Sequence, residues 1–335
     1  MKKIATSGYF LIVISALGFS FKSILVKTAY QFGVDATTLM LMRMYISLPF
    51  FAATLFILEG RQGFHITGRE AVKYSFLGIV GIGCAMLFSF LSLEKLEASL
   101  ATLVVFTYPA MTMLMLHAFS GEKLTLSRLA AMVITFAGLI FLIRLDHVDF
   151  FAIKGKGIMF ALLSAFCFAI YNALSQRALK HESPVRLTTN AAVFLVVFFG
   201  FSLGYRSYPD NYETWAIASL LGVFTGFIPF LAYMYGIKKI GAGRAVIISS
   251  LGPVFAVIWA YIFLEERLSS VQIIGMILIL SGIITLKLRS PIMLVRGTGE
   301  EIKKSLENIA TEYAPDRKLF AFVYTPGGNR KKEGG

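Results

Sequence analysis

Long apolar stretches alternate with short polar loops along most of the chain. Continuous apolar runs of about 18 or more residues are long enough to cross a bilayer core as helices, and they lack the alternation of barrel strands. The pattern therefore predicts an all-α integral membrane protein with ten transmembrane helices. The predicted spans are 8–28, 36–57, 72–92, 98–118, 126–143, 156–176, 187–205, 214–236, 244–263 and 270–287.

The two halves of the chain resemble each other. Landmarks of the stretch 93–143 recur 144 positions later without a gap, as 109 and 253 do. Each copy has an apolar run, a short polar hairpin and a second apolar run, so the sequence indicates a duplicated unit. The matching pairs include Lys95 and Lys239, Pro109 and Pro253, Glu122 and Glu266, and Gly138 and Gly282.

The duplication sets the predicted organisation of the chain. A first five-helix repeat is expected at 8–143, a second at 156–288 and a tail at 289–335. Because each repeat has an odd number of spans, the second copy enters the membrane upside down relative to the first. Inverted repeats are typical of secondary transporters, which bind substrate near the midplane between the repeats.

Composition and charge agree with a membrane protein. The chain is 57% hydrophobic and 15% charged, whereas a soluble domain has about a quarter charged residues. The net charge of +13 comes from basic residues in loops and in the tail, where Lys and Arg set membrane orientation, so we expect no nucleic-acid partner. Their distribution favours both termini in the cytoplasm.

Patterns that would indicate catalysis are missing from the sequence. No Ser/His/Asp, metal-ligand or Walker spacing is present, and Cys84 and Cys167 both fall inside predicted spans. We therefore expect no enzyme activity, no metal and no cofactor.

Two basic residues lie inside predicted spans, where a charge is costly and suggests function. Lys22 lies close enough to the end of its span to snorkel to the interface, whereas Arg43 lies deeper. Interfacial anchoring is one interpretation of both. The other is a cationic site in a wet cavity that binds a carboxylate or phosphate, with Arg43 as the stronger candidate. All nineteen Asp and Glu lie outside the middles of the spans.

Further polar groups lie at mid-span depth. Tyr108, Tyr171, Asn172 and Tyr233 are the candidates for substrate binding beside Arg43 and Lys22. Hydrogen bonds between helices are the alternative use of such groups.

Proline and glutamate occupy equivalent places in the two repeats. Pro109 and Pro253 are expected to kink the fourth and ninth spans. Glu122 and Glu266 lie in the hairpins that follow, where hydrogen bonds or charge pairs would fix the turns. These four residues are the candidate hinge or gate positions.

The doubled pattern Pro…Gly-Glu-Lys-Leu…Gly and Pro…Glu-Glu-Arg-Leu…Gly resembles that of EamA-type members of the drug/metabolite transporter superfamily. The resemblance covers about 8–143 and 156–288. It implies a carrier in the cell inner (plasma) membrane, commonly an exporter of amino acids or other small metabolites by alternating access. Its substrates are too varied to be transferred to this chain.

The competing hypothesis is a non-transporting scaffold or sensor that acts through the basic tail. There Thr298 to Glu301 resembles a capping box that starts a short amphipathic helix, and Pro315 would end it. The partners expected are the lipid bilayer, a small-molecule substrate and, as a homodimer, a second copy of the chain.

Overall fold

The computed structural model describes residues 2–122, 124–143, 155–203, 208–263 and 269–288, and these are helical with short connections and no strand. The predicted tail and the hairpin with Glu266 lie outside the described residues. The helices are α1 Lys2–Ser20, α2 Lys22–Gln31, α3 Ala36–Glu59, α4 Gly68–Ser75, α5 Cys84–Lys95, α6 Ala98–Val105, α7 Tyr108–Ser120, α8 Leu126–Ile143, α9 Gly155–Ala178, α10 Pro184–Ser202, α11 Tyr212–Gly222, α12 Ile228–Ile240, α13 Ala242–Ile248, α14 Leu251–Phe263 and α15 Ser270–Leu288, with the short segments η1 Gly60–Phe64, η2 Phe76–Gly83 and η5 Val223–Phe227.

Every predicted apolar stretch falls on helix in the structure. Among the described residues, eight helical segments are long and apolar enough to cross a membrane. Two shorter apolar helices, Leu126–Leu142 and Ser270–Thr285, fall at the predicted fifth and tenth spans. The all-helical, multi-pass prediction is thereby confirmed.

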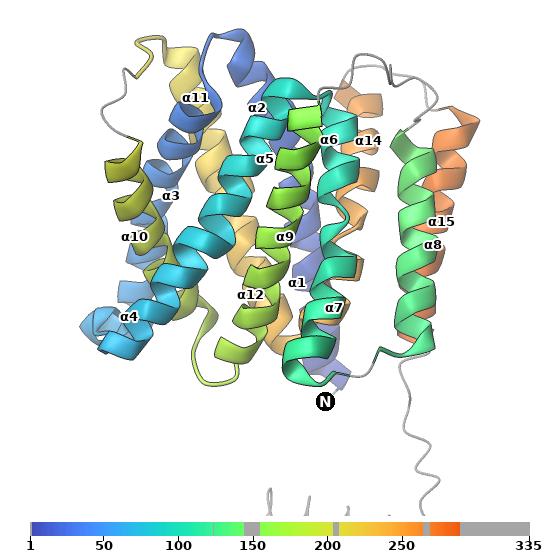
Figure 1. Cartoon of the computed structure of the whole chain (residues 1–335), viewed down its shortest axis with the longest axis horizontal. Coiled ribbons are helices and arrows are strands. Elements are labelled where there is room, and N and C mark those ends of the chain that lie inside the picture. Colours follow the sequence, from blue (N-terminus) through green and yellow to red (C-terminus); the bar gives the residue numbers. More distant parts are fainter. Residues whose placement is uncertain (1, 123, 144–154, 204–207, 264–268, 289–335) are drawn as a thin grey trace, which may run out of the picture. The chain divides into compact units, whose positions relative to one another are not determined.

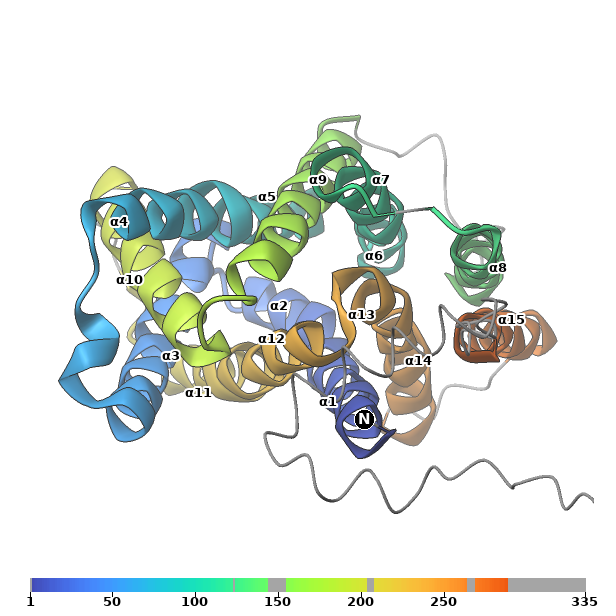
Figure 2. The same cartoon turned by 90° about the horizontal axis from the view of Figure 1, so that it is seen from below.

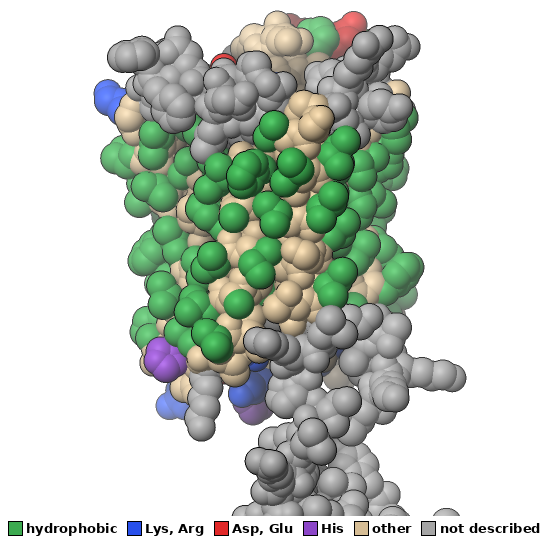
Figure 3. Space-filling model, turned by 90° about the vertical axis from the view of Figure 1, so that its right-hand side faces the viewer, with side chains coloured by type: hydrophobic (Ala, Val, Ile, Leu, Met, Phe, Trp, Pro, Cys, Tyr) green, Lys and Arg blue, Asp and Glu red, His purple; other side chains and the backbone are tan. Residues whose placement is uncertain are grey.

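The outer surface has the polarity expected for such a protein. On the face formed by α8 and α15, hydrophobic side chains cover the middle, and Lys, Arg and His lie at the lower end (Figure 3). Large side chains such as Val133, Phe141 and Ile277 are exposed there. Such a large exposed apolar surface would be unfavourable in water, whereas the hydrocarbon core of a bilayer solvates it.

Most helices pack against a helix from the other half of the chain (Figures 1 and 2). Helix α1 packs on α12, and its counterpart α9 packs on α5. Helix α3 packs on α10 and α11, and α8 packs almost entirely on α15. Segments far apart in sequence are thus brought together across the two halves.

The α8–α15 pair stands beside the other helices and is held by close backbone approach (Figure 2). A Cβ on Gly138 would lie 2.8 Å from the Gly275 carbonyl oxygen. A Cβ on Gly282 would lie 2.4 Å from Oγ1 of Thr135. Small residues let two helices approach without a side chain between them.

The fourth and ninth spans are both interrupted next to their prolines. Helix α6 ends at Val105 and α7 starts at Tyr108; α13 ends at Ile248 and α14 starts at Leu251. A proline ring clashes with the carbonyl four residues earlier, which is that of Val105 for Pro109 and of Ser249 for Pro253. The structure therefore has a helix break at each position where a proline kink was predicted.

Three further irregularities were not predicted. The third and eighth spans contain the π-helical segments η2 and η5, and the first span is interrupted at Phe21. A π-helical turn shifts the hydrogen bonds along the backbone and occurs often at functional sites.

Candidate functional site

Arg43 is buried on α3, and its guanidinium contacts the π-helical segment of the eighth span. Its residue surface is 5% exposed. The Nε atom donates to the Leu221 carbonyl at 3.2 Å, and an Nη2 atom donates to the Thr225 carbonyl at 3.0 Å. These bonds use two of the five N–H donors of a guanidinium. Arg43 thus links the first half of the chain to carbonyls of the second.

Glycine makes this contact possible. A Cβ on Gly226 would lie 3.4 Å from Nε of Arg43, and a Cβ on Gly222 would lie 3.1 Å from the Arg43 carbonyl oxygen. The hydroxyl of Thr225 also donates to the Leu221 carbonyl, at 2.9 Å. A carbonyl has two lone pairs, so the Leu221 carbonyl, near the end of α11, accepts from both Arg43 and Thr225.

Lys22 starts α2 just after the break at Phe21. Its Nζ atom donates to Oγ of Ser89 on α5 at 3.0 Å. Helix α5 contacts both α2, which carries Lys22, and α3, which carries Arg43. The two cations predicted from sequence therefore lie in the same part of the bundle.

Neither cation has a carboxylate partner among the described residues, whose ion pairs are Lys73–Glu182, Arg128–Glu122 and Arg186–Glu70. Carbonyl and hydroxyl dipoles stabilise a cation without cancelling its charge. The predicted role of the two cations in binding an anion stays a prediction.

The four polar candidates at mid-span depth also lie together, in a separate aromatic cluster around Phe168. The Phe168 ring stacks on Tyr171 and on Tyr233, with centroids 6.3 and 6.1 Å apart, and meets Tyr108 edge-on at 4.9 Å. The Tyr233 hydroxyl donates to Oδ1 of Asn172 at 2.8 Å, and Nδ2 of Asn172 donates to the Phe168 carbonyl at 2.7 Å.

The hydroxyl of Tyr108 is hydrogen-bonded to Oγ of Ser249. Tyr108 follows the break in the fourth span and Ser249 lies in the break of the ninth, so this bond joins the two breaks. In this structure the tyrosines and Asn172 bond to groups on neighbouring helices. Their substrate-binding role stays a prediction.

Glu122 belongs to a network at the end of the molecule where α7 ends and α9 ends (Figure 1). It pairs with Nη1 of Arg128 at 2.8 Å and accepts a hydrogen bond from Nε2 of Gln176 on α9. The Gln176 amide oxygen accepts from the backbone N–H of Ala242 at 2.5 Å. Glu122 is thus connected through Gln176 to the start of α13.

A second polar contact at the same end was not predicted. Glu182, in the turn between α9 and α10, pairs with Nζ of Lys73 at 2.7 Å and accepts from the Tyr74 hydroxyl. Its backbone carbonyl accepts from Nζ of Lys238 at 2.9 Å. Glu182 is one of many acidic residues in loops, so nothing in the sequence distinguishes it. Gln176 did give one, since it lies one helical turn after Asn172 on α9.

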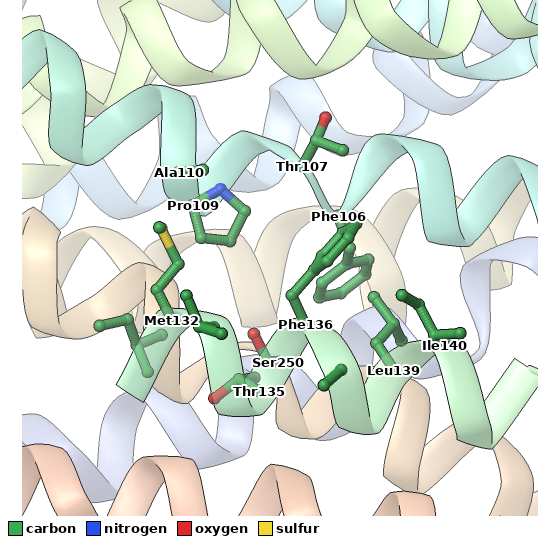
Figure 4. A pocket seen from close by; sticks show the side chains of 13 residues that line it. Phe106, Thr107, Pro109, Ala110, Met132, Thr135, Phe136, Leu139, Ile140 and Ser250 are labelled. Atoms are coloured by element: carbon green, nitrogen blue, oxygen red, sulfur yellow. The ribbon is translucent and has the colours of Figure 1, made fainter. Parts of the chain in front are cut away.

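A pocket of about 400 Å³ lies between the two helix breaks and α8 (Figure 4). Of the predicted residues, it contains Pro109 only. Its remaining walls are Phe106, Thr107, Ala110, Met132, Val133, Thr135, Phe136, Ala137, Leu139, Ile140, Ile247 and Ser250.

These features define a polytopic membrane protein of the transporter class, with two helical halves joined around buried cations and broken helices. The model of the EamA-like transporter family matches residues 6–144 and 155–288. The chain belongs to this family, as its repeated hairpin pattern suggested.

Named relatives agree with this class. An uncharacterized transporter of Bacillus subtilis, YcbK, is 25% identical over 281 residues, covering 81% of this chain and 89% of the relative. A probable amino-acid metabolite efflux pump of Escherichia coli is 25% identical over 260 residues, covering 73% and 84%. A solved crystal structure shares the fold with a TM-score of 0.71 at 19% identity, covering 84% of this chain and 97% of that one.

Proposed function

We propose that this protein is a secondary carrier that exports a small anionic or zwitterionic metabolite, such as an amino acid or organic anion. The observation that carries the proposal is Arg43: a buried guanidinium without a carboxylate partner among the described residues, in the same part of the bundle as a second cation, Lys22. A carboxylate is the natural ligand of a guanidinium because it accepts two N–H bonds in parallel. The name of the E. coli relative supports export of an amino-acid metabolite.

Alternating access between two inverted five-helix repeats is the proposed mechanism. Three symmetric features support it: the pairing of α1 with α12 and of α9 with α5, the breaks in the fourth and ninth spans, and the π-helical segments in the third and eighth. Figure 1 adds that α5 lies above α4 whereas α12 lies below α11, so these equivalent spans run in opposite directions. Inverted repeats allow one site to open to either face.

We propose that the end with Glu122 and Glu182 faces the cytoplasm of a cell whose inner (plasma) membrane holds the protein. Basic residues such as Arg69, Lys180 and Lys238 belong to this end, as the positive-inside rule requires. The hydrogen bonds of Glu122 and Glu182 join helices from both halves and would have to break for the carrier to open there. Both residues are therefore candidate gates.

The test replaces Arg43 in the purified carrier and measures uptake into proteoliposomes from a panel of amino acids and organic acids. Arg43→Gln should abolish uptake of the anionic or zwitterionic substrate, and Arg43→Lys should retain part of it because the charge remains. Arg61→Gln is the matched control, since it makes the same change at an exposed arginine just after α3 and should leave uptake unchanged. Unchanged transport in Arg43→Gln would refute the assigned role.

The second candidate function, a scaffold or sensor acting through the tail, predicts the opposite response to truncation. Deleting 297–335 should leave a carrier's transport intact, whereas a scaffold should lose its partner.

The homodimer likewise stays a prediction; light scattering of the purified chain checks it.

A further inference from the structure

The pocket beside the helix breaks has walls from three parts of the chain. Phe106 and Thr107 lie in the break between α6 and α7, with Pro109 just after it in α7, and Ser250 lies in the break between α13 and α14, with Ile247 just before it in α13. The remaining wall is α8, whose Met132 and Phe136 face the first break (Figure 4). Its volume of about 400 Å³ falls in the range of ligand sites, roughly 300–1,000 Å³.

The chemistry of the walls fits a hydrocarbon rather than the charged solute proposed above. Two of the hydroxyls are used within their own helices: that of Thr107 donates to the Val104 carbonyl at 2.7 Å, and that of Thr135 donates to the Ala131 carbonyl at 2.7 Å. None of the described residues that line the pocket is charged. A charged ligand would lose its hydration there without gaining a partner.

The pocket is continuous with the surface that faces the bilayer. Val133, Phe136 and Ile140 form its outer wall, and they are 58%, 36% and 36% exposed. The same side of the molecule carries the apolar surface of α8 and α15 (Figure 3). At the other side of the pocket, Pro109, Ile247 and Ser250 are buried. The space therefore leads from the lipid-facing surface inward to both helix breaks.

We propose that one acyl chain of a bilayer phospholipid enters laterally between α7 and α8 and occupies this pocket. The acyl chain would lie against both Pro109 and Ser250, so the lipid would contact the interrupted spans of both halves of the protein. It fills apolar volume where the breaks keep the helices from packing closely. The bound lipid thus belongs to the hinge region, apart from the cationic site at Arg43.

The first experiment uses the unaltered full-length chain in vesicles of phosphatidylethanolamine and phosphatidylglycerol. A small fraction of the phospholipid carries a diazirine in the middle of one acyl chain. After irradiation, mass spectrometry of the digested protein should find adducts within 106–110 and 247–250, in addition to adducts on the outer lipid-facing residues. Adducts confined to outward residues such as Val133 and Ile140 would overturn the proposal.

A pair of variants tests occupancy by size. Ala110→Phe places a ring in the pocket and should reduce the adducts within 247–250 to the background seen with unlabelled lipid. Ala53→Phe makes the same change at an exposed position of α3 and should leave these adducts unchanged. Equal labelling of both variants would contradict an acyl chain at this site.

A competition arm distinguishes lipid from transported solute. The amino acids and organic acids of the transport panel should not displace the diazirine lipid from 106–110 and 247–250, because the described lining of the pocket offers them no charged group. Displacement by any of them would assign the pocket to the transport path and overturn its assignment to lipid. This outcome is independent of the Arg43 experiment.

Discussion

At the residue scale, the sequence identified Arg43 and Lys22 as charges inside predicted spans, because a basic residue within an apolar run is evident from the sequence itself. It did not indicate what they contact. The acceptors of Arg43 are the carbonyls of Leu221 in α11 and Thr225 in η5, about 180 positions later, and a sequence does not report which backbone carbonyls accept a side chain's hydrogen bonds. The acid Glu182 was missed for a related reason, since its partners Lys73 and Lys238 lie in other spans.

Tyr233 gives a stability prediction at this scale. Tyr233→Phe removes the donor to Asn172 and leaves a buried amide oxygen without that partner. The free energy of unfolding should fall by about 1 kcal/mol, the usual contribution of one hydrogen bond. Thermal unfolding in detergent measures it, with the exposed Tyr212→Phe as the control that should change nothing. Equal melting temperatures would contradict the assigned bond.

Glu122 gives a prediction about access. Glu122→Ala removes the partner of Arg128 and of Gln176, so the end of the molecule near Ala242 should open more often. A cysteine in place of the buried Ser175, in a chain without Cys84 and Cys167, should then react faster with a polar maleimide. Glu213→Ala changes an exposed acid on α11 and should have no effect. Equal rates in both variants would remove Glu122 from the gate.

At the element scale, proline explains why the breaks in the fourth and ninth spans were predictable. The ring of Pro109 or Pro253 clashes with the carbonyl four residues earlier and so favours a break there, although Pro49 lies inside the uninterrupted α3. Pro229 follows η5 in the same way, four residues after the Thr225 carbonyl that accepts from Arg43. Segment η2 and the break at Phe21 have no proline beside them, and local sequence does not report their cause.

The hinge interpretation leads to a prediction for the prolines. Pro109→Ala or Pro253→Ala restores a backbone donor and should make the span more continuous and stiffer. Maximal transport rate should fall while the apparent substrate affinity changes little, because the cationic site is not touched. Pro49→Ala is the control, since Pro49 lies inside the uninterrupted α3. A normal rate in both hinge variants would show that the breaks are only structural.

The α8–α15 contact is predicted to tolerate no added methyl group. Gly138→Ala puts a Cβ 2.8 Å from the Gly275 carbonyl oxygen, so the two helices must separate. The cost should be about 1–3 kcal/mol, as for other overpacked sites. Gly155→Ala is the matched control because a Cβ there meets nothing within 4 Å. Chemical unfolding of both variants in the same detergent makes the comparison.

At the scale of the whole molecule, the multi-pass helical architecture was predictable because bilayer thickness dictates span length. Orientation gives the corresponding test. Cysteines at Lys180 and Arg69 should be labelled by an impermeant maleimide only from the cytoplasmic side, and cysteines at Phe32 and Tyr212 only from the opposite side. Labelling in the reverse pattern would invert the proposed topology and place the Glu122 network outside.

The α8–α15 pair also constrains how the protein is made. Gly138 and Gly282 come from helices that leave the ribosome far apart in time: at about 5–20 residues per second, the delay is roughly 7–30 s. During this interval α8 lacks its partner, and the face that carries Gly138 is not covered by α15. Pairing with α15 therefore comes late in assembly, and a nascent chain that stops before 270 leaves the glycine face of α8 open to quality-control proteases or another helix.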